Sequence, residues 1–178
     1  MNGILLVNKE PDWTSFDVIA KLRGVLKQKK IGHTGTLDPL ATGLLVLLLG
    51  KATKAADLMP DQDKAYLAGF RLGVESNTED ISGELKEISE KKVSKDEVVS
   101  ALAKFSGKMM QTPPMFSAVQ KDGVKLYKLA LRGESVERAA KAIEVFHSEL
   151  LDFDEKTREG TAFFLVSKGT YVRTLLSD

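Results

Sequence analysis

Apolar residues recur along this chain in two spacings, one typical of strands and the other typical of helices. Alternating or continuous apolar runs bounded by turn residues predict strands, which we expect at residues 3–9, 44–49, 65–72, 115–120, 136–146 and 161–167. The helical period predicts helices at 15–26, 95–105, 124–131 and 171–178. Thr14 or Ser15 and, further on, Ser94 are suitable helix caps. The run LLVLLL at 44–49 lacks alternation, which favours a strand buried on both faces.

The connections between these elements vary in length and do not alternate regularly between strand and helix. This arrangement favours an α+β fold with a mixed sheet over a doubly wound parallel sheet. The 178 residues are about the length of one domain. The final TYVRTLLSD ends inside a predicted helix without a stop signal, so we expect residues 1–178 to be a truncated domain.

The net charge is only +1, but the charges are unevenly distributed. Residues 1–54 carry eight basic and four acidic side chains, a net charge of +4. Residues 75–100 carry four basic and eight acidic side chains (−4), and residues 101–133 carry six basic side chains and one acidic side chain (+5). Two basic segments around an acidic one fit a surface that binds phosphates. Solvated charged faces would produce the same distribution.

The chain has no cysteine, which excludes disulfides, a cysteine nucleophile and a zinc-type deaminase site. His33 and His147 are far apart and form no HExxH motif, which argues against any metal site. No window reaches the ~18 apolar residues of a membrane span, and the N-terminus lacks the features of a signal peptide. These observations predict a cytoplasmic protein without metal or membrane association.

The segment GHTGTLDPLATG at 32–43 is the strongest candidate for chemistry. It presents a single acid, Asp38, in a loop where Gly32 and Gly35 permit close approach of a ligand and Pro39 adds stiffness. Several cations precede it, and an apolar strand follows. An acid in these surroundings suggests chemistry on a polyanion, although Asp before Pro is also common in ordinary turns.

Two residues far from Asp38 in the sequence extend this hypothesis. If Thr170 caps the last helix, Arg173 lies in its first turn, where the helix dipole disfavours a cation by ~0.3–1 kcal/mol. Arg173 therefore calls for an anionic partner, and a pair with Asp38 would keep that carboxylate ionised. Tyr66, at the start of a predicted strand, could pack in the core or stack on a nucleobase, as could Tyr127 or Tyr171.

The sequence around residue 51, GKAT, resembles a phosphate-binding loop only superficially. Ala52 stands where a hydroxyl is needed for magnesium and the preceding glycine spacing is wrong, which excludes a nucleotide kinase or NTPase of this type. Lys51 and Lys54 remain candidates for contacts with backbone phosphates.

Several motifs, in order, closely resemble the TruB family of tRNA pseudouridine synthases, and the resemblance extends over essentially the whole chain. The motifs are GHTGTLDPLATGLL at 32–45, GKATK at 50–54, KAY at 64–66, TEDISGE at 78–84, QTPPMFSA at 111–118, KLYKLALRGESVER at 125–138 and SKGTYVRTL at 167–175. The resemblance implies a central, mostly antiparallel mixed sheet flanked by helices.

The resemblance also implies an activity, the conversion of uridine 55 in the T loop of tRNA to pseudouridine, with the target base flipped and without cofactor or metal. Asp38 matches the catalytic nucleophile, Tyr66 the tyrosine that stacks on the base, and Arg173 the arginine that pairs with the acid. His33 matches the histidine that enters the space left by the flipped base. The other residues that we assign to RNA binding are Lys9, Lys30, Gly32, Lys51, Lys54 and Tyr171.

The chain departs from the family pattern at Glu10, Asp12, Phe116 and Ala139. The resemblance also implies that full-length members continue with more of the catalytic domain and a small C-terminal RNA-binding domain, both of which we expect to be missing from residues 1–178. Two alternatives stay open. The chain could belong to a guide-RNA-dependent synthase of the dyskerin type, against which the short N-terminus argues. It could also hold or remodel tRNA as a binding module without turning it over. No protein partner is indicated.

Overall fold

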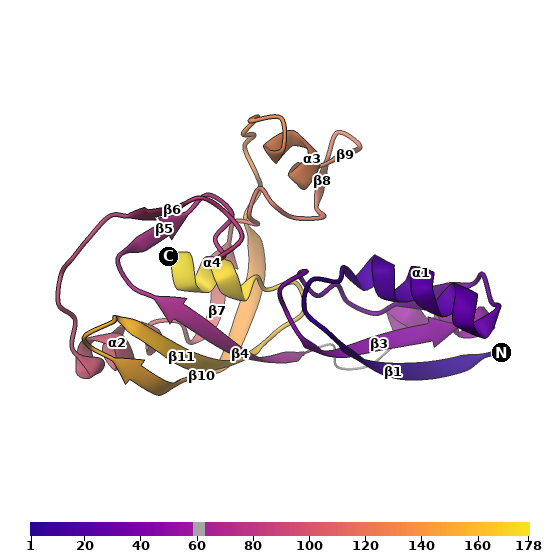
Figure 1. The fold of residues 1–178 in the computed structure, drawn as a ribbon, viewed down its shortest axis with the longest axis horizontal. Coiled ribbons are helices and arrows are strands. Elements are labelled where there is room, and N and C mark those ends of the chain that lie inside the picture. Colours follow the sequence, from indigo (N-terminus) through magenta and orange to yellow (C-terminus); the bar gives the residue numbers. More distant parts are fainter. Residues whose placement is uncertain (59–62) are drawn as a thin grey trace. The chain divides into compact units, whose positions relative to one another are not determined.

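The computed structural model describes residues 1–58 and 63–178, which divide into two compact units, Met1–Asp61 and Gln62–Asp178. Both units combine helices with antiparallel strands (Figure 1), which confirms the α+β prediction. Among the described residues, every helix is too short or too polar to cross a membrane.

The first unit is a three-stranded antiparallel sheet in the order β1 (Gly3–Lys9), β3 (Gly43–Leu49), β2 (Ile31–His33). Helix α1 (Ser15–Leu26) packs on one face of this sheet, and the 3₁₀ helix η1 (Gly50–Leu58) follows β3 directly. The core between helix and sheet consists of the buried residues Val18, Ile19, Ile31, Leu45, Leu47 and Leu49.

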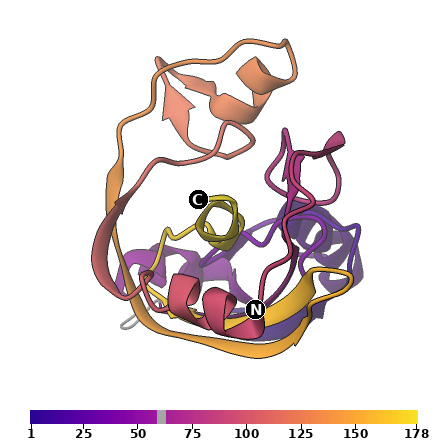
Figure 2. The same ribbon diagram turned by 90° about the vertical axis from the view of Figure 1, so that its left-hand side faces the viewer.

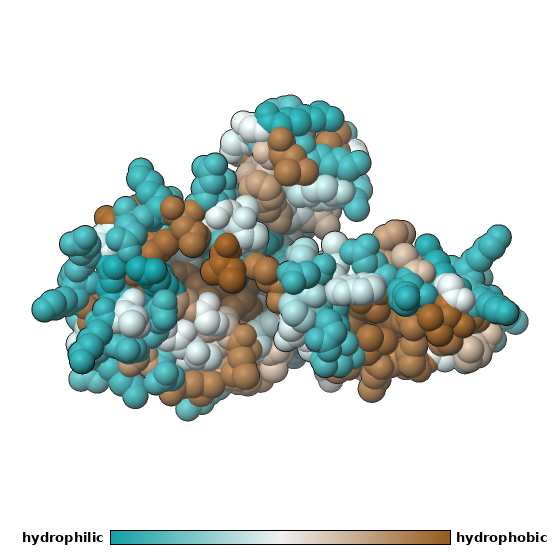
Figure 3. Space-filling model, in the orientation of Figure 1, coloured by the Kyte–Doolittle hydropathy of each residue, from teal (hydrophilic) through white to brown (hydrophobic). Residues whose placement is uncertain are grey.

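The pattern of burial along β3 agrees only in part with the prediction of a strand buried on both faces. Leu47 and Leu48 are both buried, so the second half of the strand is covered on both faces, as expected. Leu44 is 63% exposed and belongs with Ile4 and Leu6 to the sheet face turned away from α1. Figure 3 shows apolar side chains gathered along this unit at the lower right.

Helix α1 begins as the sequence predicts. Thr14 is its N-cap and forms a capping box with Asp17, in which the Thr14 side chain accepts from the Asp17 amide and the Asp17 carboxylate accepts from the Thr14 amide. Ser15 is therefore the first helical residue. Helix α2 (Lys95–Leu102) has the same arrangement with Ser94 as its cap.

The second unit is built on a four-stranded antiparallel sheet in the order β4 (Lys64–Arg71), β11 (Glu159–Val166), β10 (Lys141–Asp154), β7 (Gly107–Gln111). Helices α2 and α4 (Val172–Ser177) both contribute to the core on one face of this sheet, and Figure 2 shows α4 end-on above the curved strands. Two short hairpins complete the unit: β5 (Val74–Ser76) with β6 (Leu85–Glu87), and β8 (Gln120–Lys121) with β9 (Val124–Lys125), which leads into α3 (Leu126–Ala130).

The strand predicted at 115–120 is wrong except for its last residue. The Ser117 and Val119 carbonyls accept hydrogen bonds from Tyr127 and Leu126, so this backbone is paired with the start of α3 rather than with a strand. The strand predicted at 136–146 begins only at Lys141 and extends to Asp154.

The start of the last helix also differs from the prediction. The Thr170 hydroxyl donates to the Ser167 carbonyl at 2.9 Å instead of capping the helix. The N-cap position falls on Tyr171, which has no side-chain capping bond. Arg173 still lies in the first turn, as predicted.

Candidate active site

Asp38 lies in the loop between β2 and β3, and this loop is closed by backbone hydrogen bonds. The Ala41 amide donates to the Asp38 carbonyl at 3.0 Å, and the Thr34 amide donates to the Val46 carbonyl at 3.1 Å. The Asp38 side chain is half-buried. The loop thus presents the acid from the end of a packed sheet.

The two residues that flank Asp38 are held by other parts of the first unit. Before it, the Leu37 amide donates to the Ser15 hydroxyl at 2.9 Å. After it, the Pro39 carbonyl accepts from the Asp12 amide at 3.0 Å and from the Lys9 ammonium at 2.9 Å. The backbone is therefore fixed on both sides of the acid.

Lys9 is fully buried, with 0% of its surface exposed. Its ammonium donates to the carbonyls of Glu10, Trp13 and Pro39 at 3.0, 2.7 and 2.9 Å. Burial lowers the pKa of Lys9, and attraction to the Asp12 and Asp38 carboxylates offsets part of that effect. Because the ammonium is enclosed and hydrogen-bonded, our assignment of Lys9 to RNA binding is corrected to a structural role.

His33 ends β2 opposite Leu47, and its ring is half-buried. Burial lowers the pKa of His33, while a hydrogen bond with the Gly35 backbone acts in the opposite direction. Since its pKa falls below the ordinary value of 6.5, the imidazole is neutral at pH 7. A neutral ring suits insertion between nucleobases.

Gly32 lies inside β2, and a Cβ added there would contact only Thr53, at 3.7 Å. Packing within the described fold therefore does not require glycine at this position. The nearby lysines Lys30, Lys51 and Lys54 are all exposed. The Gly50 amide donates to the Lys30 carbonyl at 2.8 Å, which brings the first two of these lysines close together in the backbone.

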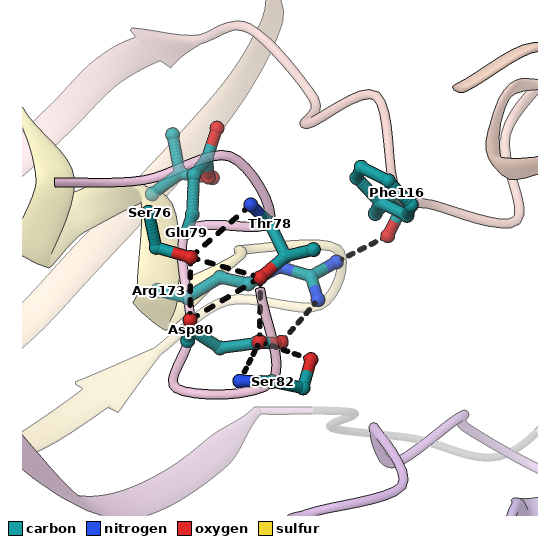
Figure 4. A network of polar contacts seen from close by, with 8 residues as sticks. Ser76, Thr78, Glu79, Asp80, Ser82, Phe116 and Arg173 are labelled. Carbon is teal, nitrogen blue, oxygen red and sulfur yellow. Dashed lines mark hydrogen bonds and ion pairs between the residues drawn. The ribbon is translucent and has the colours of Figure 1, made fainter. Parts of the chain in front are cut away.

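Arg173 lies in the second unit and is held by two partners there. Its side chain is only 12% exposed. One guanidinium nitrogen donates to the Phe116 carbonyl at 2.6 Å, and another forms an ion pair with Asp80 at 3.5 Å (Figure 4). The guanidinium also lies 5.7 Å from the centre of the Tyr171 ring. The anionic partner that its helix position calls for is thus present in Asp80.

Asp80 sits in a turn rich in hydroxyl groups. Its carboxylate accepts from the Thr78 hydroxyl at 2.7 Å and from the Ser82 amide at 2.9 Å (Figure 4). Burial raises the pKa of Asp80, but the hydrogen bonds from Ser82 and Thr78 and the charge of Arg173 together outweigh burial and lower it. Asp80 is consequently a carboxylate at neutral pH.

Sequence reasoning missed Asp80. The available signals were a cation on an unfavourable helix turn and a carboxylate inside the hydroxyl-rich TEDIS turn. It also missed Gln111, a buried residue whose side-chain amide makes two hydrogen bonds with the backbone of Tyr171, at 2.8 and 3.0 Å. Gln111 thereby fixes the residue at which α4 begins.

Tyr66 lies in β4 opposite Phe164, half-buried against the core of the second unit. The predicted site residues are therefore divided between the units: Asp38 and His33 in the first, Tyr66, Tyr171 and Arg173 in the second. The Asp38–Arg173 pair stays a prediction. Within the described ranges, no three histidine or acidic side chains gather closely enough to hold a metal ion.

Comparisons with known proteins identify the family. A family model for TruB family pseudouridylate synthase (N terminal domain) matches residues 23–172. tRNA pseudouridine synthase B of Fusobacterium nucleatum is 49% identical over 181 residues, covering 100% of this chain and 61% of that protein. The same protein of Alkaliphilus oremlandii is 46% identical, covering 100% of this chain and 59% of that one.

The fold is also found in solved structures. In a Cbf5–Nop10–Gar1 complex, one chain has a TM-score of 0.72 at 26% identity, covering 98% of this chain and 42% of that one. An H/ACA RNP bound to a substrate RNA contains a chain with a TM-score of 0.68 at 23% identity, with coverages of 98% and 40%. The chain spans about three-fifths of the length of the curated relatives named above. Since the family match covers most of its residues, the chain belongs to the TruB family of pseudouridylate synthases.

Proposed function

We propose that the protein containing this chain converts uridine 55 in the T loop of tRNA to pseudouridine, with Asp38 as the nucleophile. The observation that carries this proposal is the position of Asp38, a lone acid in the family's catalytic motif, whose flanking residues are both held by buried groups. The relatives named tRNA pseudouridine synthase B supply the substrate class.

The reaction breaks the bond between N1 of uracil and C1′ of ribose, turns the base, and joins C5 to C1′. The C5 proton leaves and N1 gains a proton, so no atom is gained or lost overall and no electron donor is required. Asp38 supplies a carboxylate that attacks C1′ or C6. Tyr66 stacks on the detached base and Arg173 pairs with Asp38, and the Arg173 guanidinium also forms its ion pair with Asp80.

The RNA-binding surface in this proposal combines cations with a neutral imidazole. Lys30, Lys51 and Lys54 are exposed and contact phosphates. Flipping the uridine costs a few kcal/mol of stacking, and the neutral ring of His33 enters the vacated space and offsets part of that cost. Tyr171, whose ring lies near the Arg173 guanidinium, lines the surface that binds the base.

We also infer that the protein acts in the cytoplasm and that residues 1–178 form part of its catalytic domain. A guide-RNA-dependent activity has weaker support, because the similar chains in the Cbf5–Nop10–Gar1 complex and in the H/ACA RNP are only 26% and 23% identical to this one. Identity to tRNA pseudouridine synthase B reaches 49%.

The test uses the full-length protein and a T-arm RNA that carries tritium at C5 of the target uridine. Isomerisation expels the C5 proton, so we expect tritium to appear in water in proportion to the RNA converted. A protein that binds the RNA tightly and releases no tritium would be a binding module, and the proposed activity would be rejected.

A further inference from the structure

The Ser15 hydroxyl engages both polar backbone groups of the residue that precedes Asp38. It accepts from the Leu37 amide at 2.9 Å and donates to the Leu37 carbonyl at 3.2 Å. Ser15 is 2% exposed, so water does not compete for these bonds. A single buried hydroxyl thereby fixes the orientation of two successive peptide groups, one of which joins Leu37 to Asp38.

Ser15 is itself held rigidly. It is the first residue of α1, directly after the N-cap residue Thr14. The next turn of α1 is anchored in the core through Val18 and Ile19, which are 8% and 3% exposed. Because Ser15 belongs to this packed helix, it holds the loop in a fixed position relative to α1.

On the other side of Asp38, the Pro39 carbonyl is held by Lys9 and by the Asp12 amide. The Asp38 backbone thus lies between two anchored residues, and its carboxylate has little freedom beyond its own side-chain rotation. Loss of either anchor would let the loop shift, and a displacement of about 1 Å at a reacting group can lower a rate about 100-fold.

We infer that Ser15 is a positioning residue for Asp38, which sets the direction of the carboxylate without contacting RNA. This inference rests on the proposed function. A buried residue that acts through Asp38 affects the rate of the chemical step and leaves the affinity for RNA unchanged, so the two properties can be tested separately.

The experiment measures single-turnover tritium release and tRNA affinity for full-length wild type, Ser15→Ala and Ser15→Cys. Ser15→Ala removes the hydroxyl, and Ser15→Cys fills the same space with a weaker donor and acceptor. We expect the maximal rate to fall about 10- to 100-fold in Ser15→Ala and less in Ser15→Cys. The Kd for tRNA stays within about twofold in both.

The matched control is Thr14→Ala, which removes the neighbouring hydroxyl and weakens the cap of the same helix without touching Leu37. We expect it to lower the melting temperature and to keep the wild-type rate. An unchanged rate in Ser15→Ala, or an equal loss in Thr14→Ala, would overturn the inference while the activity stands. If Ser15→Ala does not fold, a wild-type rate in Ser15→Cys overturns it. Inactive wild type would reject the proposed function and the inference together.

Discussion

The buried ammonium of Lys9 gives the most quantitative prediction. Lys9→Met keeps the length of the side chain but removes its three hydrogen bonds. The Pro39 carbonyl keeps the Asp12 amide as a donor, whereas the Glu10 and Trp13 carbonyls lose the Lys9 donor. An unmade hydrogen bond to a buried group costs about 1–3 kcal/mol.

Part of this loss is recovered, because methionine also removes the unfavourable burial of a charge. That burial is what lowers the pKa of Lys9. We therefore expect Lys9→Met to lower the free energy of unfolding by about 1–3 kcal/mol net. For a chain of this size, such a loss lowers the melting temperature by roughly 2–12 °C.

Thermal melts, together with tRNA binding measured at several salt concentrations, distinguish a structural role of Lys9 from direct contact with RNA. Lys9→Met should leave the slope of log Kd against log salt unchanged. Replacement of the exposed Lys54 by methionine should reduce that slope by about 0.7–0.9 with little change in stability. A structural role of Lys9 would be refuted if Lys9→Met had the melting temperature of wild type and its slope of log Kd against log salt were reduced by one unit.

Two further variants test the second unit. Asp80→Asn should destabilise the protein at pH 7, because Arg173 loses the ion pair that it forms with Asp80. Since folding lowers the pKa of Asp80 below its ordinary value of 3.8, its stabilising effect is complete above that pH and is lost as the pH falls through the folded-state pKa. A difference between wild type and Asp80→Asn that stayed constant from pH 7 to pH 2 would contradict this. Gly73→Ala should destabilise more than Gly133→Ala in urea unfolding: both glycines have positive φ, 80° and 73°, but only at Gly73 would the added Cβ overlap the Ser89 carbonyl. Equal destabilisation would show that the overlap is relieved at no cost.

Local patterns in the sequence were sufficient to predict the helices and strands whose ends are determined by residues within or next to them. The strand at 3–9 and the helix from Ser15 follow from alternation, helical period and a capping box that spans four consecutive residues. β7 was missed because GKMMQ offers only two apolar residues, and it becomes a strand through pairing with β10, about 30 residues later. Residues 115–120 look like a strand but pair with the start of α3.

The same distinction between local and distant contacts applies to the candidate site. Asp38, Tyr66 and Arg173 stand in recognisable motifs, so the sequence was sufficient to propose them as site residues. Their supporting residues did not stand out, because Ser15 and Leu37 are 22 positions apart, and a serine at a helix start is ordinarily interpreted as a cap. Lys9 was misassigned for a related reason, since lysine is rarely fully buried and its enclosure depends on three carbonyls from two loops.

The role of Asp38 is tested most directly by tritium release from T-arm RNA with full-length Asp38→Asn, compared with Asp152→Asn, a substitution at an exposed acid of β10. We predict that Asp38→Asn releases no tritium above the background without enzyme and binds tRNA within a few-fold of wild type. We predict that Asp152→Asn is fully active. Release by Asp38→Asn at a rate close to that of wild type would contradict the assignment of Asp38 as the nucleophile.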